Sequence, residues 1–140
     1  MRKLLIMIAI LMISAVSFAA ELDKKNAKPL PADGGDPGKV YMQYLKAMDS
    51  DDFATLKKVM TAEEAKTIDL PEFKKMFPMM KSMHAKEIKI VSGMSDGKVA
   101  VLEATGKDQS GKKSKGTLTF EMENKEWKVK DDAWATDLNQ

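Results

Sequence analysis

The spacing of apolar residues changes from a helical period to a strand period at Lys86, and this change constrains the fold more than any other feature. Before it, apolar residues recur three or four positions apart, as on one face of a helix. After it they alternate, and turn residues recur at Ser95-Asp96-Gly97, Asp108 to Gly111 and Asn124-Lys125. The pattern therefore predicts four strands, at 86–93, 98–106, 114–123 and 126–132.

The four predicted strands are joined by short turns, so neighbouring strands should pair antiparallel. A two-residue turn at Asn124-Lys125 places Met122 opposite Trp127 and Phe120 opposite Val129, and these residues share one buried face with Leu118. The strand at 98–106 is apolar on both faces, which favours a central position in the sheet. Helices followed by an antiparallel meander predict an α+β fold, with N-terminal helices packed on a curved four-stranded antiparallel β-sheet.

Four helices are expected before the sheet, at 36–48, 51–60, 61–68 and 71–83. Asp36 followed by Pro37 is typical of a helix N-terminus. Thr61 and Glu64 have the spacing of a capping box. In the last helix, Pro78 lies on the lysine-bearing side, so a kink is expected rather than a break.

The N-terminus has the pattern of an export signal. Arg2 and Lys3 precede a nearly unbroken apolar run of about 13 residues, and Ser17-Phe18-Ala19 supplies small residues at a cleavage site. The run is shorter than the roughly 20 residues of a membrane span, which makes a retained anchor the weaker alternative. We expect cleavage after Ala19 and a periplasmic or secreted protein. Residues 20–35 are expected to be a flexible tether, 36–134 the folded domain and 135–140 a C-terminal tail.

Charge and composition exclude several function classes. Of 23 basic residues, Arg2 and Lys3 belong to the expected signal, which leaves 21 lysines against 21 acidic residues. A neutral chain without arginine lacks the basic surface and guanidinium groups of nucleic-acid readers, so no nucleic-acid partner is expected. Without cysteine, neither disulfides nor lipid attachment at a lipoprotein cysteine can form.

The order of elements resembles the nuclear-transport-factor-2-like (cystatin-like cone) superfamily, and above all its small exported bacterial domains. The similar residues are the helix from Val40 to Met48, the acidic break and helix from Asp51 to Leu56, and the closing strands with Trp127-Lys128-Val129 and Trp134. One departure is that no strand is predicted between the second helix and the methionine-rich helix. The superfamily also contains ketosteroid isomerases and polyketide-cyclase-like proteins.

The resemblance implies one enzymatic alternative, proton transfer of the ketosteroid-isomerase type, in which a pocket carboxylate moves a proton and a tyrosine donates to an oxyanion. Glu103 interrupts the apolar second strand, and Tyr41 and Tyr44 lie on the inner side of the first helix. The plainer interpretation pairs Glu103 across strands with a lysine such as Lys115, while the tyrosines pack their rings in the core.

A methionine and histidine cluster gives a second alternative, because thioethers and imidazole are ligands for Cu(I). The residues are Met79, Met80 and Met83, with His84 at the junction between helix and strand. The same methionines also have the spacing of a buried helix face. His84 could act as a general base, but a partly exposed connecting histidine is the simpler interpretation. No cofactor is expected.

The sequence best supports a non-catalytic binding module of the bacterial cell envelope, which holds a small apolar ligand or a protein partner. No stable membrane span is expected after signal cleavage, and the resemblance allows a homodimer through the open sheet face. Eight residues are expected to line or fill the cavity between helices and sheet: Phe73, Met76, Phe77, Met80, Leu118, Phe120, Met122 and Trp127.

Overall fold

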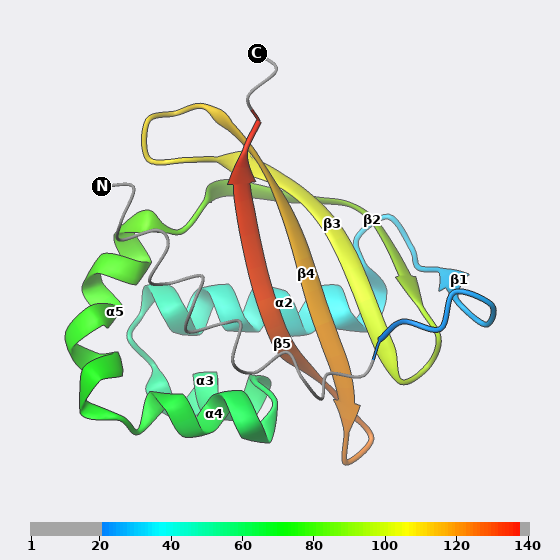
Figure 1. Cartoon of the computed structure of the whole chain (residues 1–140), viewed down its shortest axis with the longest axis horizontal. Coiled ribbons are helices and arrows are strands. Elements are labelled where there is room, and N and C mark those ends of the chain that lie inside the picture. The colour runs from blue at the N-terminus through cyan, green and yellow to red at the C-terminus, as the bar shows by residue number, and fades with distance from the viewer. Residues whose placement is uncertain (1–20, 138–140) are drawn as a thin grey trace.

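The computed structural model describes residues 21–137 of the 140-residue chain (Figure 1). The expected signal peptide, its cleavage site after Ala19 and the end of the expected tail lie outside these residues. Within them, four helices precede four long antiparallel strands, which confirms the α+β class.

The four helices lie close to their predicted positions. They are α2 (Gly35–Asp49), α3 (Phe53–Val59), α4 (Ala62–Ile68) and α5 (Pro71–Met83). Thr61 caps α4 as predicted, because its hydroxyl accepts a hydrogen bond from the Glu64 N–H at 3.4 Å. The N-cap of α2 is Gly34 rather than Asp36, since the chain enters the helix through a left-handed turn at φ 84°. Helix α5 continues through Pro78, which is exposed.

The sheet has five strands, one more than predicted. In spatial order they are β1 (Lys28–Pro29), β2 (Lys86–Ser95), β3 (Val99–Lys107), β4 (Lys113–Glu123) and β5 (Glu126–Thr136), with every neighbouring pair antiparallel. The extra strand β1 lies in the segment expected to be a tether. Leu30 holds this segment in place, because its N–H donates to the Gly93 carbonyl at 2.9 Å and its side chain packs on the core.

The register of β4 and β5 is as predicted near the turn and then shifts. Phe120 is opposite Val129 and Met122 opposite Trp127, and Asn124 and Lys125 have the positive φ values of a type I′ turn. Beyond Val129 the pairing skips Lys130, so that Asp131 is opposite Thr119. This bulge moves the alternation of β5 by one residue.

Two apolar clusters form the core. The first joins the sheet to α2, which crosses one face of the sheet, and it includes Tyr41, Leu102, Leu118 and Phe120, all 0% exposed. The second lies where α3 and α5 meet the end of α2, and includes Leu56, Ile68 and Phe77. Tyr44 packs against both clusters. Helix α5 therefore stands to the side of the sheet rather than over it (Figure 1).

None of the helices in residues 21–137 combines the length and the apolar character that crossing a membrane requires.

Candidate functional site

An open groove of about 1070 Å³ lies between α2, α5 and the start of β2. Its deepest apolar side chains are largely buried: Met48 is 7% exposed, Phe77 4% and Ala85 8%. Phe53 stands edge-on to Phe77 with ring centroids 5.0 Å apart. The remaining apolar lining comes from Met42, Leu45, Pro78 and Ile88. Helix α2 and helix α5 thus form two walls around an apolar floor.

Charged side chains surround this floor. Lys81 forms an ion pair with Asp51 across the groove at 2.7 Å, and Glu87 pairs with Lys107 at 2.8 Å. The ammonium groups of Lys74 and Lys81 lie over the rings of Phe53 and Phe77, at 6.0 and 5.9 Å from the ring centroids. The lysine stems therefore extend the apolar surface while their charged ends stay in water.

Backbone strain is concentrated in the same groove. Outside the Asn124-Lys125 turn, the non-glycine residues with positive φ in the described part of the chain are Asp51 at 55° and Glu87 at 53°. Both line the groove. Left-handed backbone costs free energy for a residue such as Glu87 and less for Asp51, which directly follows the end of α2, and such strained residues cluster at functional sites.

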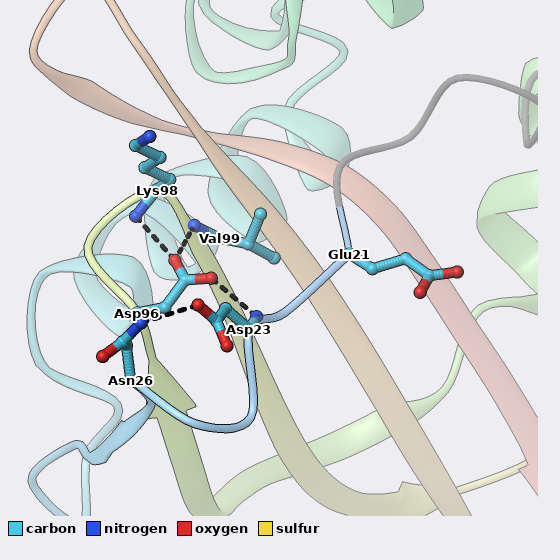
Figure 2. A pocket seen from close by; sticks show the side chains of 6 residues that line it. All are labelled: Glu21, Asp23, Asn26, Asp96, Lys98 and Val99. Atoms are coloured by element: carbon cyan, nitrogen blue, oxygen red, sulfur yellow. Dashed lines mark hydrogen bonds between the residues drawn. The ribbon is translucent and has the colours of Figure 1, made fainter.

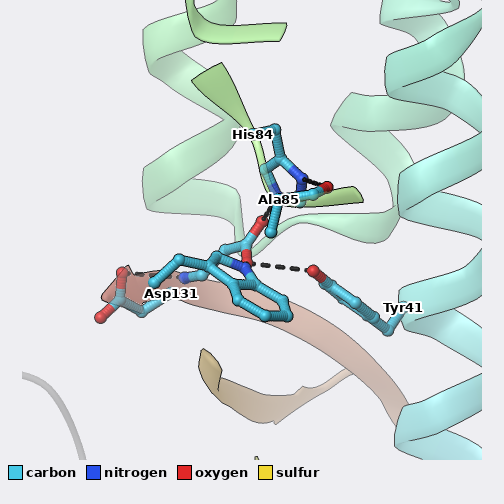
Figure 3. A network of polar contacts seen from close by, with 6 residues as sticks. Tyr41, His84, Ala85 and Asp131 are labelled. Atoms are coloured by element: carbon cyan, nitrogen blue, oxygen red, sulfur yellow. Dashed lines mark hydrogen bonds and ion pairs between the residues drawn. The ribbon is translucent and has the colours of Figure 1, made fainter. Parts of the chain in front are cut away.

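A network of polar contacts is centred on Asp132 (Figure 3), and two of its members, His84 and Ala85, also line the groove. The Tyr41 hydroxyl and the Trp134 indole N–H both donate to Asp132 Oδ1, at 3.0 and 2.6 Å. His84 Nε2 lies 2.6 Å from Asp132 Oδ2, and His84 Nδ1 lies 3.0 Å from the Ala85 carbonyl oxygen. The side chains of His84 and Asp132 are 14% and 8% exposed. The network joins α2, β5 and the connection between α5 and β2.

The bulge in β5 is what brings Asp132 into this network. Strict alternation from Trp127 and Val129 would turn Asp131 inward, but the shifted register puts Asp132 opposite the buried Leu118. Trp134 follows on the same face, opposite Gly116. A Cβ at Gly116 would come within 2.7 Å of the Trp134 ring, so the glycine leaves the space in which the indole lies flat and aims its N–H at Asp132.

The partners of His84 favour its protonated state. A carboxylate oxygen and a carbonyl oxygen accept hydrogen bonds, so the imidazolium, in which both ring nitrogens donate, satisfies both contacts. Burial opposes this charge, but the hydrogen bond and the negative charge of Asp132 outweigh it and raise the pKa of His84. An imidazolium whose two N–H groups are both bonded has no lone pair for a metal ion or for a substrate proton.

The two tyrosines at the network also stay protonated. Burial and the negative charge of Asp132 raise the pKa of Tyr41 well above its ordinary value, and the same two causes raise that of Tyr44. Glu103 lies on the opposite face of the sheet, exposed, with Thr117 as its cross-strand partner. The structure therefore does not bring Glu103 to the tyrosines. Nor does Glu103 pair with Lys115, which forms an ion pair with Asp137 at 3.6 Å.

The eight residues expected to line one cavity belong to separate places. Leu118 and Phe120 are fully buried in the sheet cluster, and Trp127 packs against that cluster beside its cross-strand partner Met122. Phe73 packs against the helix cluster. Met76 and Met80 are half-buried on α5, and of the eight residues Phe77 alone lines the groove.

The residues of the copper alternative lie at the end of α5, with Met79, Met80 and Met83 on the helix and His84 at its C-cap. Met79 is 39% exposed, and both ring nitrogens of His84 are bonded within the protein. Across residues 21–137, no group of three or more histidine, cysteine, aspartate or glutamate side chains is arranged to hold a metal ion.

A second, smaller depression of about 370 Å³ lies where the N-terminal segment meets the β2–β3 turn (Figure 2). The Asp96 carboxylate accepts hydrogen bonds from the backbone N–H groups of Asp23, Lys98 and Val99. These bonds lower the pKa of Asp96. They close the turn and tether the segment, which accounts for the depression as a structural feature.

Comparison with known proteins found no matching family model, no matching curated protein and no matching solved structure. The resemblance to the nuclear-transport-factor-2-like superfamily remains a prediction.

Proposed function

We propose that this protein is an exported, non-catalytic binding module of the bacterial cell envelope, and that the groove between α2, α5 and β2 holds a small apolar ligand. The observation that carries the proposal is the groove itself, whose volume of about 1070 Å³ is slightly above that of most ligand pockets and whose floor is apolar. The two strained residues in its wall support the same location. This groove differs in position from the cavity between helices and sheet that the sequence favoured.

A binding role is supported over catalysis by the state of the polar groups. Proton transfer needs an acid or base that can exchange a proton with a substrate. His84 Nε2 is bonded to Asp132 and His84 Nδ1 to the Ala85 carbonyl oxygen, and the Tyr41 hydroxyl donates a hydrogen bond to the same aspartate. These titratable groups come closest to a catalytic constellation, but their hydrogen bonds are made within the protein.

Titration with the neutral fluorescent probe N-phenyl-1-naphthylamine tests the proposal. Met42 lines the groove and is 59% exposed, so Met42→Glu should leave the fold intact while placing a charge beside the ligand. Half-burial of a methionine is worth about 1 kcal/mol, so the affinity should fall by about fivefold or more. Met79→Glu is the matched control, because Met79 is exposed on α5 outside the groove. Absence of saturable binding, or equal losses in the two variants, would contradict the proposal.

A further inference from the structure

Around the groove, more lysines than acidic residues lack an ion-pair partner. Asp51 and Glu87 already have lysine partners, in Lys81 and Lys107. Three other lysines of the lining make no ion pair within residues 21–137: Lys46, Lys74 and Lys86. Asp49 is the lining acid that makes none in the same part of the chain. The groove therefore offers more unneutralised positive than negative charge to a ligand.

These lysines stand on three different elements around one apolar floor. Lys46 is on α2, Lys74 on α5 and Lys86 at the start of β2, and all three are exposed. The ammonium group of lysine is a compact charge on a long flexible stem, so it can follow a head group at the mouth of the groove. A ligand with an apolar chain on the floor and an anionic head group at the rim satisfies both parts of the lining.

The shape of the groove favours a free amphiphile over a bilayer surface. Proteins that bind bilayers insert protruding apolar side chains into the interface. Here Met42, at 59%, is the one large apolar side chain of the lining within residues 21–137 that is exposed, and a single side chain is a weak anchor in a bilayer. The half-buried Leu45 and Ile88 leave apolar surface between the charged residues, which suits a single chain.

From this geometry we propose that the groove selects free single-chain amphiphiles with an anionic head group, such as long-chain carboxylates. The inference rests on the proposed ligand-binding function of the same groove. Lys46 and Lys86 attract the head group, and the floor around Leu45 and Ile88 receives the chain.

Displacement of N-phenyl-1-naphthylamine by dodecanoate and by dodecanol tests the inference, because the two competitors share a chain and differ in head-group charge. Two exposed ion pairs predict that dodecanoate binds about three- to tenfold more tightly at low salt. High salt should reduce this preference. The double variant Lys46→Gln/Lys86→Gln should lose the preference and keep its affinity for dodecanol. Lys66→Gln/Lys89→Gln is the matched control, since both lysines are exposed outside the groove.

The outcomes separate this inference from the proposed function. Equal binding of the two competitors would overturn the charge selectivity while leaving an apolar binding site. Failure of both competitors and of the probe would overturn the binding function and the inference together. A dodecanoate preference that survives in the Lys46/Lys86 variant would also overturn the inference. If phosphatidylglycerol vesicles displaced the probe more strongly than dodecanoate, the ligand would be a membrane surface, and the inference of a free amphiphile would be overturned.

Discussion

Replacing Asp132 with asparagine tests the charge assigned to the buried network. The substitution keeps the shape of the side chain, and an amide oxygen in place of Oδ1 can still accept from Tyr41 and Trp134. The amide nitrogen would then face His84 Nε2, which in the wild type donates to Oδ2. Two donors would point at each other, so His84 must lose a proton for the hydrogen bond to re-form.

The expected cost follows from that conflict. A hydrogen bond between charged groups contributes about 1.5–3 kcal/mol, so Asp132→Asn should lower the free energy of unfolding by about that amount in mildly acidic solution. The difference should shrink in mildly alkaline solution, where the neutral imidazole accepts from the amide and still donates to Ala85. Burial without a nearby anion should also move the pKa of His84 below its ordinary value in the variant.

The sign of the pH dependence differs between the two proteins. In the wild type the pKa of His84 is raised by folding, so its stabilising contribution is complete below about pH 6.5 and is lost as pH rises through the folded pKa. In the variant the folded pKa is lowered, so stability should rise with pH up to about pH 6.5, the unfolded value, and level off above it. Chemical denaturation from about pH 5.5 to about pH 9 measures both slopes.

The chain has a single histidine, so its imidazole proton signal in NMR reports the pKa of His84 without ambiguity. Asp131→Asn is a control for the loss of a negative charge next to the network, because Asp131 bonds the backbone N–H of Asp132 and does not contact His84. A wild-type stability that increases across this pH window, or a His84 pKa that is the same in the wild type and in Asp132→Asn, would refute the reasoning.

Two further substitutions test the features that position the network and its strand. Gly116→Ala should lower the free energy of unfolding by about 1–3 kcal/mol, because the new methyl group meets the Trp134 ring at 2.7 Å; a neutral effect in urea denaturation would show that the indole lies elsewhere. Lys125→Gly should raise the free energy of unfolding by about 1 kcal/mol, because glycine adopts the φ of 65° at this position without strain. Lys112→Gly is the control, since Lys112 does not have a positive φ, and it should not stabilise the protein. Thermal melts compare the two variants.

The helices and the long strands could be predicted because each is encoded locally. The apolar period of α5, the capping box at Thr61 and the Asn124-Lys125 turn each act within a few residues. Strand β1 could not be predicted in this way. It spans two residues, one of them a proline, and is held by a backbone bond from Leu30 to the distant Gly93. No periodic pattern exists over so short a segment.

The Asp132 network was missed for a different reason. Alternation from Trp127 and Val129 points Asp131 and Ala133 inward, and the bulge reverses this assignment. A signal was present, since Val129 and Trp134 are both large and apolar but five residues apart. An odd separation between two inward residues requires a bulge. The groove had no comparable signal, because it arises from the way α2 and α5 stand apart, which is a property of tertiary packing.

His84 links the network to the groove, and its charge decides what a ligand meets there. The residue lines the groove, yet its imidazolium charge is matched by the Asp132 carboxylate 2.6 Å away, so the pair adds no net charge to the wall. The lysines without acidic partners therefore dominate the field at the groove. A protonated His84 also keeps its ring fixed between β5 and the Ala85 carbonyl, which holds the start of β2 in place. The same contacts that remove His84 from catalysis thus build one wall of the binding site.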